Sequence, residues 1–190
     1  MEVIAYVVLA LIVIIIIYGI SIYNRLVDIK HNVSQAWSNI DVLLKQRHDE
    51  LPKLVETCKH YMSYEQETLK QVIAARSQVA AAREAGNIGA LGSAESSLRI
   101  GLGNLFAVAE NYPELKASEK FQHLQVRITG LENSIADRRE FYNETVKINN
   151  VRIEQFPDVL IARWFHFTRR DLLEFNESDK ADVNISHLFH

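Results

Sequence analysis

The pattern of hydrophobic and polar positions changes once along this sequence, near residue 22. The stretch from Val3 to Ile22 reads VIAYVVLALIVIIIIYGISI and contains no charged residue. Beyond it, apolar residues recur at alternating steps of three and four, which places them on one face of an α-helix. These positions are Leu26, Ile29, Val33, Ala36, Ile40 and Leu43, with Trp37 and Leu44 beside them. We therefore expect a membrane segment that continues into an amphipathic helix.

The uncharged stretch is long enough to cross a bilayer, because about twenty residues at ~1.5 Å each span the ~30 Å hydrocarbon layer. A cleaved signal peptide and a buried core helix are the alternatives. The acidic start Met1-Glu2 and the lack of a small-x-small cleavage pattern argue against a signal peptide. We predict an uncleaved anchor over residues 1–22. Its representative positions are Val3, Leu9, Ile14, Ile17, Tyr18 and Ile22.

The charges near this anchor predict its orientation. Arg25 and Lys30 follow the segment, whereas no lysine or arginine precedes it. Cytoplasmic flanks of membrane helices carry the excess of basic residues, so we expect the N-terminus outside and the helical domain in the cytoplasm. The single cysteine, Cys58, cannot form an internal disulfide and is compatible with a reducing compartment.

Pro52 marks the first expected break in the helical pattern. We predict a hairpin there, because proline is common in the first turn of a helix and disfavoured inside one. A kinked continuous helix is the alternative. The second helix, from Pro52 to Arg83, has one apolar face. Glu65 and Arg76 fall on that face, and we interpret them as boundary positions whose charged ends reach water, in preference to a buried functional pair.

Two further helices complete the expected domain. Residues 85–93 contain three glycines and predict a flexible connection. A short helix from Ala94 to Glu110 follows, and the last helix runs from Ser118 to Pro157. This last helix keeps a heptad pattern that is typical of a coiled coil. Arg138 and Asn149 interrupt its apolar seam, and we expect them to set the register of packing.

The expected fold class is all-α, with an N-terminal transmembrane helix continuous with a long antiparallel four-helix-bundle soluble domain. The anchor covers residues 1–22, the bundle residues 23–157, and an aromatic and basic segment with a polar tail residues 158–190. Seven glycines and three prolines are few for 190 residues. This composition disfavours the many tight turns of a sandwich or barrel.

Neither charge nor motifs indicate catalysis or nucleic-acid binding. The net charge of -3 and the pI near 6.2 leave no broad cationic field for a phosphate backbone. The sequence has no paired Cys/His spacing for zinc, no Glu-x-x-His pairs for a di-metal site and no glycine-rich phosphate loop. Glu56 with His60, and Glu119 with His123, are spaced as surface helix pairs. We therefore expect no catalytic, cofactor-binding or metal-binding residue and no enzyme activity.

The segment after Pro157 combines aromatic bulk with arginines, a composition that is typical of the membrane interface. We hypothesise that it lies against lipid headgroups or a neighbouring subunit. A cap folded over the end of the helical domain is the alternative. The residues that carry this hypothesis are Trp164, Phe165, Phe167, Arg169 and Arg170.

Several sequence blocks together resemble one protein family. They are YNRLV at 23–27, AWSNIDVLLKQR at 36–47, LPKLVET at 51–57, EQETL at 65–69, AENYPELKA at 109–117, ENSIA at 132–136 and FP at 156–157. In this order they resemble the LemA family over most of residues 23–162. The resemblance implies a bacterial inner-membrane protein with an N-terminal anchor, a four-helix soluble domain and no assigned catalytic residues. The chain departs from the usual pattern at Tyr64, at Gly130-Leu131 and at His166, where a glycine usually stands between two phenylalanines.

Two kinds of function are compatible with these features. We favour a non-enzymatic, membrane-anchored helical scaffold that self-associates at the bacterial inner membrane and organises the envelope. The alternative is a sensor or adaptor that regulates another envelope protein through its helical face. The expected partners are the lipid bilayer, further copies of the chain and other membrane proteins, but not nucleic acid, and no cofactor is expected.

Overall fold

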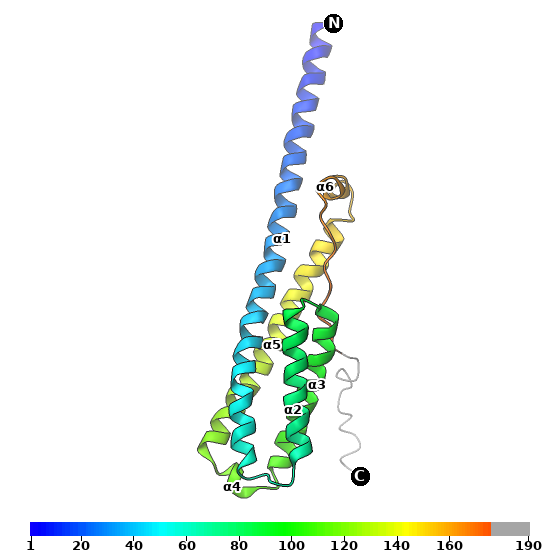
Figure 1. The fold of residues 1–190 in the computed structure, drawn as a ribbon. Coiled ribbons are helices and arrows are strands. Elements are labelled where there is room, and N and C mark those ends of the chain that lie inside the picture. Colours follow the sequence, from blue (N-terminus) through cyan, green and yellow to red (C-terminus); the bar gives the residue numbers. More distant parts are fainter. Residues whose placement is uncertain (176–190) are drawn as a thin grey trace, which may run out of the picture. The chain divides into compact units, whose positions relative to one another are not determined.

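The computed structural model describes residues 1–175, so residues 176–190 of the predicted C-terminal segment lie outside it. Within the described residues the chain forms helices and no strand (Figure 1). This confirms the prediction of an all-α chain. The helices are α1 (Glu2–Lys59), α2 (Gln66–Glu84), α3 (Ile88–Ala109), α4 (Pro113–Lys116), α5 (Glu119–Arg152) and α6 (Asp158–Trp164).

The described residues form two compact units. The first, which we call the N-terminal unit, contains Met1–Asn39 and Glu140–Asp171. The second, which we call the central unit, contains Ile40–Arg139 and, among the described residues, 172–175. The long helices α1 and α5 each contribute one part to each unit.

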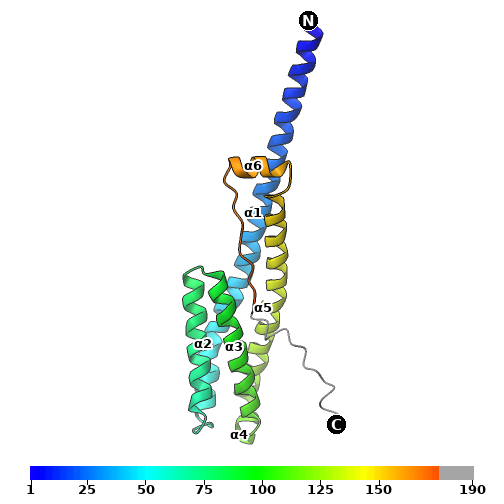
Figure 2. The ribbon, with the colours of Figure 1, turned by 90° about the vertical axis from the view of Figure 1, so that its right-hand side faces the viewer.

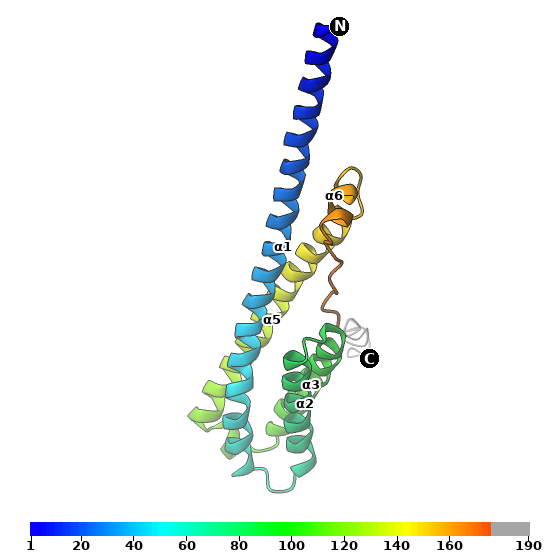
Figure 3. The same ribbon diagram turned by 45° about the horizontal axis from the view of Figure 1, so that its top comes forward.

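In the N-terminal unit, α6 lies across α1 near the end of α5, and the chain then returns along α5 as an extended segment (Figures 2 and 3). A buried cluster joins α1, α6 and the turn that follows α5, because apolar side chains from each of them meet there. Its members are Ile22, Leu26, Ile153 and Ala162, with Ile161 and Phe167 packed against them. Farther along the same unit, Trp37 packs on Tyr142 with the ring centroids 5.6 Å apart.

In the central unit, α2 and α3 are joined by a short turn and lie side by side (Figures 1 and 2). They approach closely at Gly101, where a Cβ would lie 3.5 Å from Cγ2 of Val72. The second part of α1 and the first part of α5 supply further buried side chains. Fully buried members of this core include Ile40, Leu44, Leu54, Leu98, Leu105 and Ile128.

The predicted hairpin at Pro52 is wrong, and the alternative of a continuous helix is correct. Pro52 lies inside α1, which runs on to Lys59. A proline inside a helix leaves the carbonyl four residues earlier without its N–H partner. That carbonyl belongs to His48, and Nε of Arg76 on α2 donates a hydrogen bond to it at 3.0 Å. The half-buried Arg76 therefore replaces the missing backbone donor, and the chain reverses only between Lys59 and Gln66.

The connection predicted at residues 85–93 is shorter in the structure, because α2 ends at Glu84 and α3 already begins at Ile88. Gly86 has φ +63°, and the N–H of Asn87 donates to the carbonyl of Ala82, which ends α2. The side chain of Asn87 then accepts a hydrogen bond from the N–H of Ala90 at 2.9 Å and caps α3. Gly92 lies within α3, where a Cβ would overlap the carbonyl of Glu174. The glycine thus makes room for the chain that follows the extended segment.

The last long helix has its predicted apolar face but ends earlier than expected. α5 stops at Arg152, and the residues that lead to Pro157 form turns before α6 begins. Asn149 is buried on the packed side, whereas Arg138 is exposed and does not lie in the seam. The side chain of Phe156, which falls within the predicted range of this helix, is 80% exposed.

Candidate functional site

The apolar part of α1 is the first feature that bears on function. Among the described residues, α1 is the one helix long and apolar enough to cross a membrane, with a mean hydropathy of 3.1 over its most apolar window and none of that window buried. Predicted anchor residues such as Leu9, Ile14 and Ile17 are 58%, 60% and 61% exposed. Ile22 differs, because it is buried against α6. Packing within the unit therefore begins where the exposed apolar surface ends.

Short helix α6 lies at that boundary. Ala162 joins the cluster around Ile22, and Cδ1 of Ile161 lies 3.9 Å from the position that a Cβ on Gly19 would occupy. At the start of α6 the buried carboxylate of Asp158 lies 3.5 Å from Nη1 of Arg152. The apolar contacts hold α6 against α1 near the end of the apolar stretch, and the Asp158–Arg152 pair holds the start of α6 against the end of α5.

The outer side of α6 exposes apolar side chains. Leu160 and Trp164 are spaced four residues apart, which places them on one helical face. They are 60% and 80% exposed, and Arg163 beside them is exposed as well. Of the residues predicted to contact lipid or a subunit, Phe165 is half exposed and its ring centroid lies 4.6 Å from that of Tyr23. Phe167 instead packs against the buried cluster.

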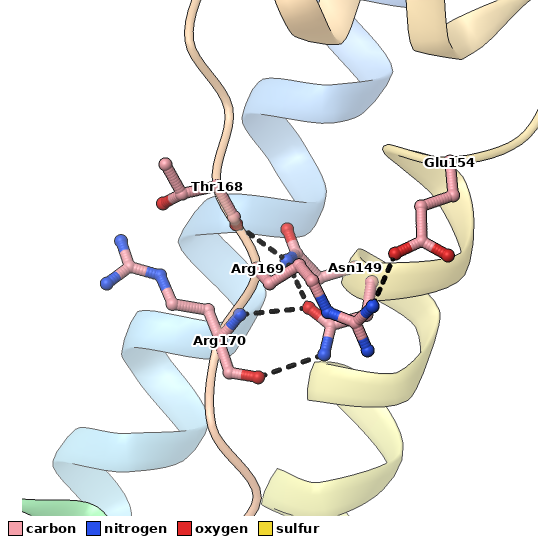
Figure 4. A network of polar contacts seen from close by, with 6 residues as sticks. Asn149, Glu154, Thr168, Arg169 and Arg170 are labelled. Carbon is pink, nitrogen blue, oxygen red and sulfur yellow. Dashed lines mark hydrogen bonds and ion pairs between the residues drawn. The ribbon is translucent and has the colours of Figure 1, made fainter.

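The extended segment after α6 is attached to α5 by side-chain amides (Figure 4). Nδ2 of Asn149 donates to the carbonyl of Thr168 at 3.3 Å. The neighbouring Asn150 donates to the carbonyl of Arg170 and accepts from its N–H, both at 2.9 Å. Nη1 of Arg169 pairs with Glu154 at 2.7 Å, where both side chains are exposed. Arg169 and Arg170, both predicted to contact lipid or a subunit, therefore differ. Arg169 forms an ion pair with Glu154, whereas the side chain of Arg170 extends away from α5 (Figure 4).

A cleft of about 290 Å³ opens between α1, α5 and this segment in the N-terminal unit. Its basic lining residues are Lys30, His31, His166 and Arg170. Its aromatic and remaining lining residues are Tyr23, Phe165, Phe167, Val27, Asn149 and Thr168. Among residues 1–175, no acidic side chain lines it. His166 has φ 55°, an unusual value for a residue other than glycine, so the backbone turns sharply at the edge of the cleft.

The central unit contains a buried ion-pair network that the sequence analysis did not identify. Nη2 of Arg47 lies 2.5 Å from Oε1 of Glu95, and Nη1 lies 2.5 Å from Oε1 of Glu132. Arg47 is 1% exposed and Glu95 2%. Burial disfavours the charge on Arg47, but the two carboxylates outweigh it and raise the guanidinium pKa. Burial also raises the pKa of Glu95, against the opposing effect of Arg47.

One signal for this network was present in the sequence. Arg47 follows Ile40 and Leu44 at the spacing of the apolar face of α1, so its position on the buried side of the helix could be predicted. Its partners were not, because nothing local relates α1 to Glu95 on α3 or to Glu132 on α5. Glu65 and Arg76, predicted as boundary positions, are both half-buried, and Arg76 bonds His48.

The other candidate reactive groups do not lie together at one site. Cys58 is fully buried, and burial raises the pKa of its thiol to about 12. Glu56, Glu119 and His123 are exposed on their helices, and His60 is exposed in the turn that follows α1. Within residues 1–175 no group of three or more His, Cys, Asp or Glu side chains is placed to hold a metal ion.

Comparison with known proteins agrees with the sequence blocks. The magnetosome protein MamQ 2 of Paramagnetospirillum magneticum is 24% identical over 186 residues, which cover 86% of this chain and 68% of the relative. The magnetosome protein MamQ of Magnetospirillum gryphiswaldense is 23% identical with the same coverage. Protein LemA of Metamycoplasma hominis is 26% identical over 172 residues, covering 87% of this chain and 74% of the relative. The sequence profile of the LemA family matches residues 36–187, and the chain therefore belongs to the LemA family.

Proposed function

We propose that this LemA-family protein is a non-enzymatic, membrane-anchored helical scaffold that self-associates at the bacterial inner membrane. The observation that carries the proposal is the continuity of α1, which runs without interruption from an exposed apolar stretch into buried packing positions. A helix of this kind transmits the orientation of the lipid-embedded part to the packed part. In this proposal the soluble helices form an antiparallel four-helix bundle around the second part of α1.

The position of α6 supports a bilayer around residues 3–22. Trp164 and Leu160 lie beside the end of the apolar stretch, where the headgroup region would begin, and tryptophan favours that region. Arg25 and Lys30 follow the stretch, so the packed helices lie on the cytoplasmic side and the N-terminus outside.

Fluorescence of Trp164 tests this bilayer position. The chain has two tryptophans, so Trp37→Phe leaves Trp164 as the sole emitter. In liposomes we expect lipids brominated near the headgroup to quench Trp164, with a shift of emission to shorter wavelength. Trp164→Phe, which retains only the half-buried Trp37, is the matched control. Quenching of Trp164 by aqueous acrylamide with no effect of brominated lipid would contradict contact between α6 and the bilayer.

Exposed apolar residues on α5 support self-association. Phe141, Ile148 and Val151 are 50%, 46% and 54% exposed. Their spacing of seven and three residues aligns them along one side of the helix, where a second copy can pack. A large exposed apolar surface is otherwise unfavourable in water. The exposed isoleucines of α1 would add contacts inside the bilayer.

Cysteine crosslinking tests this association. Ile148→Cys introduces a thiol on the α5 stripe, and the native Cys58 stays unreactive because it is buried and its pKa is raised. We expect disulfide-linked dimers of the full chain in native membranes. Gln35→Cys, at an exposed polar position of α1 in the same unit, is the control that should not crosslink. The total mass of the purified protein in native-like nanodiscs gives the number of copies.

The possible outcomes separate the proposal from its alternative. A uniform monomer in nanodiscs, with no Ile148→Cys adduct to itself, removes self-association. An adduct between Ile148→Cys and one other envelope protein would instead favour a sensor or adaptor that acts through this helical face.

A further inference from the structure

The cleft in the N-terminal unit has the chemistry of an anion site. Lys30, His31, His166 and Arg170 line it, and none of its other lining residues in the described part of the chain is acidic. The side chains of Lys30 and Arg170 are exposed. Lysine supplies a compact charge, and arginine supplies a planar fork that matches the oxygens of a phosphate.

The backbone around the cleft is fixed independently of any ligand. Asn150 holds both polar groups of the Arg170 backbone at 2.9 Å, and Asn149 holds the carbonyl of Thr168 (Figure 4). These bonds occupy the side of the segment that faces α5, and the Arg170 guanidinium extends to the other side. At the opposite edge, Phe165 packs on Tyr23 and the chain turns at His166 with a positive φ. A site held open by its own hydrogen bonds loses little entropy when it binds.

The position of the cleft along the axis of α1 indicates that the anion is a lipid phosphate. This step rests on the proposed membrane position of residues 3–22. Tyr23 follows the apolar stretch directly, and Lys30 lies about 10 Å farther along the helix. The headgroup layer of one leaflet is ~5–8 Å thick, and a lysine side chain reaches several ångströms upward. The basic groups thus meet lipid phosphates, while Tyr23 and Phe165 face the glycerol and upper acyl region.

We propose that this cleft binds the phosphate of an anionic phospholipid from the leaflet on the side of the packed helices. Lys30 and Arg170 contact the phosphate, and the aromatic wall of Tyr23 and Phe165 contacts the glycerol backbone. A free phosphate shares the charged part of this chemistry but lacks the part that the aromatic wall recognises.

Native mass spectrometry of the full-length protein in detergent tests the site with defined probes. The probes are dioctanoyl-phosphatidylglycerol, dioctanoyl-phosphatidylcholine and inorganic phosphate. We expect a one-to-one adduct with phosphatidylglycerol and roughly tenfold weaker binding after Lys30→Gln with Arg170→Gln, because each lost contact is a charge-assisted hydrogen bond. The exchange Lys30→Arg with Arg170→Lys keeps both charges and should restore most of the affinity.

A matched control separates a built site from general attraction to charge. Lys147→Gln with Arg138→Gln removes the same two residue types at exposed positions away from the cleft, and binding should not change. An equal loss in this control, equal binding of phosphatidylcholine, or equally tight binding of inorganic phosphate would each overturn the lipid site. Extraction by alkaline carbonate reports membrane anchoring separately, so a protein that stays in the pellet but binds no phosphatidylglycerol refutes this inference alone.

Discussion

The two units of this protein stabilise their interiors with different polar chemistry. In the central unit a buried guanidinium, Arg47, pairs with Glu95 and Glu132 at 2.5 Å each. In the N-terminal unit the buried amide of Asn149 and the phenol of Tyr142 donate to the backbone carbonyls of Thr168 and Asp171. Both members of the Arg47–Glu95 pair are buried, whereas the pair between Arg152 and the buried Asp158 in the N-terminal unit has a half-buried arginine.

This difference indicates what each unit must achieve. A buried ion pair contributes little net stability but strongly penalises any packing that separates its charges, so it specifies the arrangement of α1, α3 and α5. Neutral side-chain donors bonded to the main chain attach the extended segment, and each such hydrogen bond contributes only a modest net stability. The N-terminal unit can therefore carry exposed side chains such as Trp164 and Leu160 on a short helix, while the central unit fixes its helices.

The largest effect is expected from breaking the charged network. Arg47→Ala leaves Glu95 buried without its cation, at a cost of about 3–5 kcal/mol in unfolding free energy. Denaturation of the full-length protein in detergent, followed by circular dichroism, measures this cost. Burial already raises the pKa of Glu95, and removal of Arg47 raises it further. A carboxyl with a raised folded-state pKa loses stability as pH rises through that value, so the variant should be more stable at pH 5 than at pH 8.

A double substitution sharpens the same test. Arg47→Met with Glu95→Leu removes both buried charges and should recover much of the stability lost in Arg47→Ala, because no uncompensated charge remains. If the double variant is as unstable as the single one, packing volume at Arg47 and not charge accounts for the loss.

The second prediction concerns the proline inside α1. Arg76→Met removes the donor to the His48 carbonyl, which Pro52 leaves without a backbone partner, and should cost roughly 1–3 kcal/mol. Burial and the nearby Arg76 lower the pKa of His48, so the neutral ring accepts a second bond from Nη2 of Arg76 at 2.6 Å. Pro52→Ala restores the N–H of the helix, and Arg76→Met should then cost clearly less. Thermal denaturation of the native protein, the two single variants and the double variant measures these costs. If Arg76→Met costs the same stability with and without Pro52, Arg76 does not replace the missing backbone donor.

These contacts show how much of the fold the sequence could predict. Periodicity found the exposed apolar stretch, the buried face of α1 at Leu26 and Ile40, and that of α5 at Ile128, because these signals are local. It failed at Pro52, because the donor that allows the helix to continue comes from Arg76, twenty-four positions later. A local rule for proline cannot include a partner on another helix.

The candidate site was predictable to a similar extent. The aromatic and basic composition after Pro157 singled out Trp164 and Phe165. Both side chains are exposed, and their contact with lipid or a subunit stays a prediction. The composition could not separate Phe167, which packs inward, from its exposed neighbours. It also could not place Lys30 beside Arg170, because the amides of Asn149 and Asn150 determine the path of the extended segment.

The third prediction concerns a hydrogen bond between an uncharged side chain and the main chain in the N-terminal unit. Asn149→Ala removes the donor to the Thr168 carbonyl and should cost about 1–2 kcal/mol, less than the change at Arg47, because no buried charge is left unpaired. The effect should be local. Hydrogen–deuterium exchange at residues 168–171 should increase, while exchange in α2 and α3 stays unchanged. Uniformly faster exchange through both units would show that the two kinds of bonding are not separable in this way.

The smallest effect is expected at a half-exposed ion pair of the central unit, between Arg83 on α2 and Asp41 on α1. A hydrogen bond from Arg83 is the main cause of a lowered pKa at Asp41. A lowered carboxyl pKa contributes stability above its unfolded-state value and loses it as pH falls through the folded-state value. Asp41→Asn should therefore cost less than about 1 kcal/mol at pH 7, because water screens the pair, and progressively less as the pH falls toward 3. Asp49→Asn, at an exposed position of the same helix, should cost less at both pH values. A loss at Asp41 as large as that at Arg47 would mean that burial does not set the strength of ion pairs in this unit.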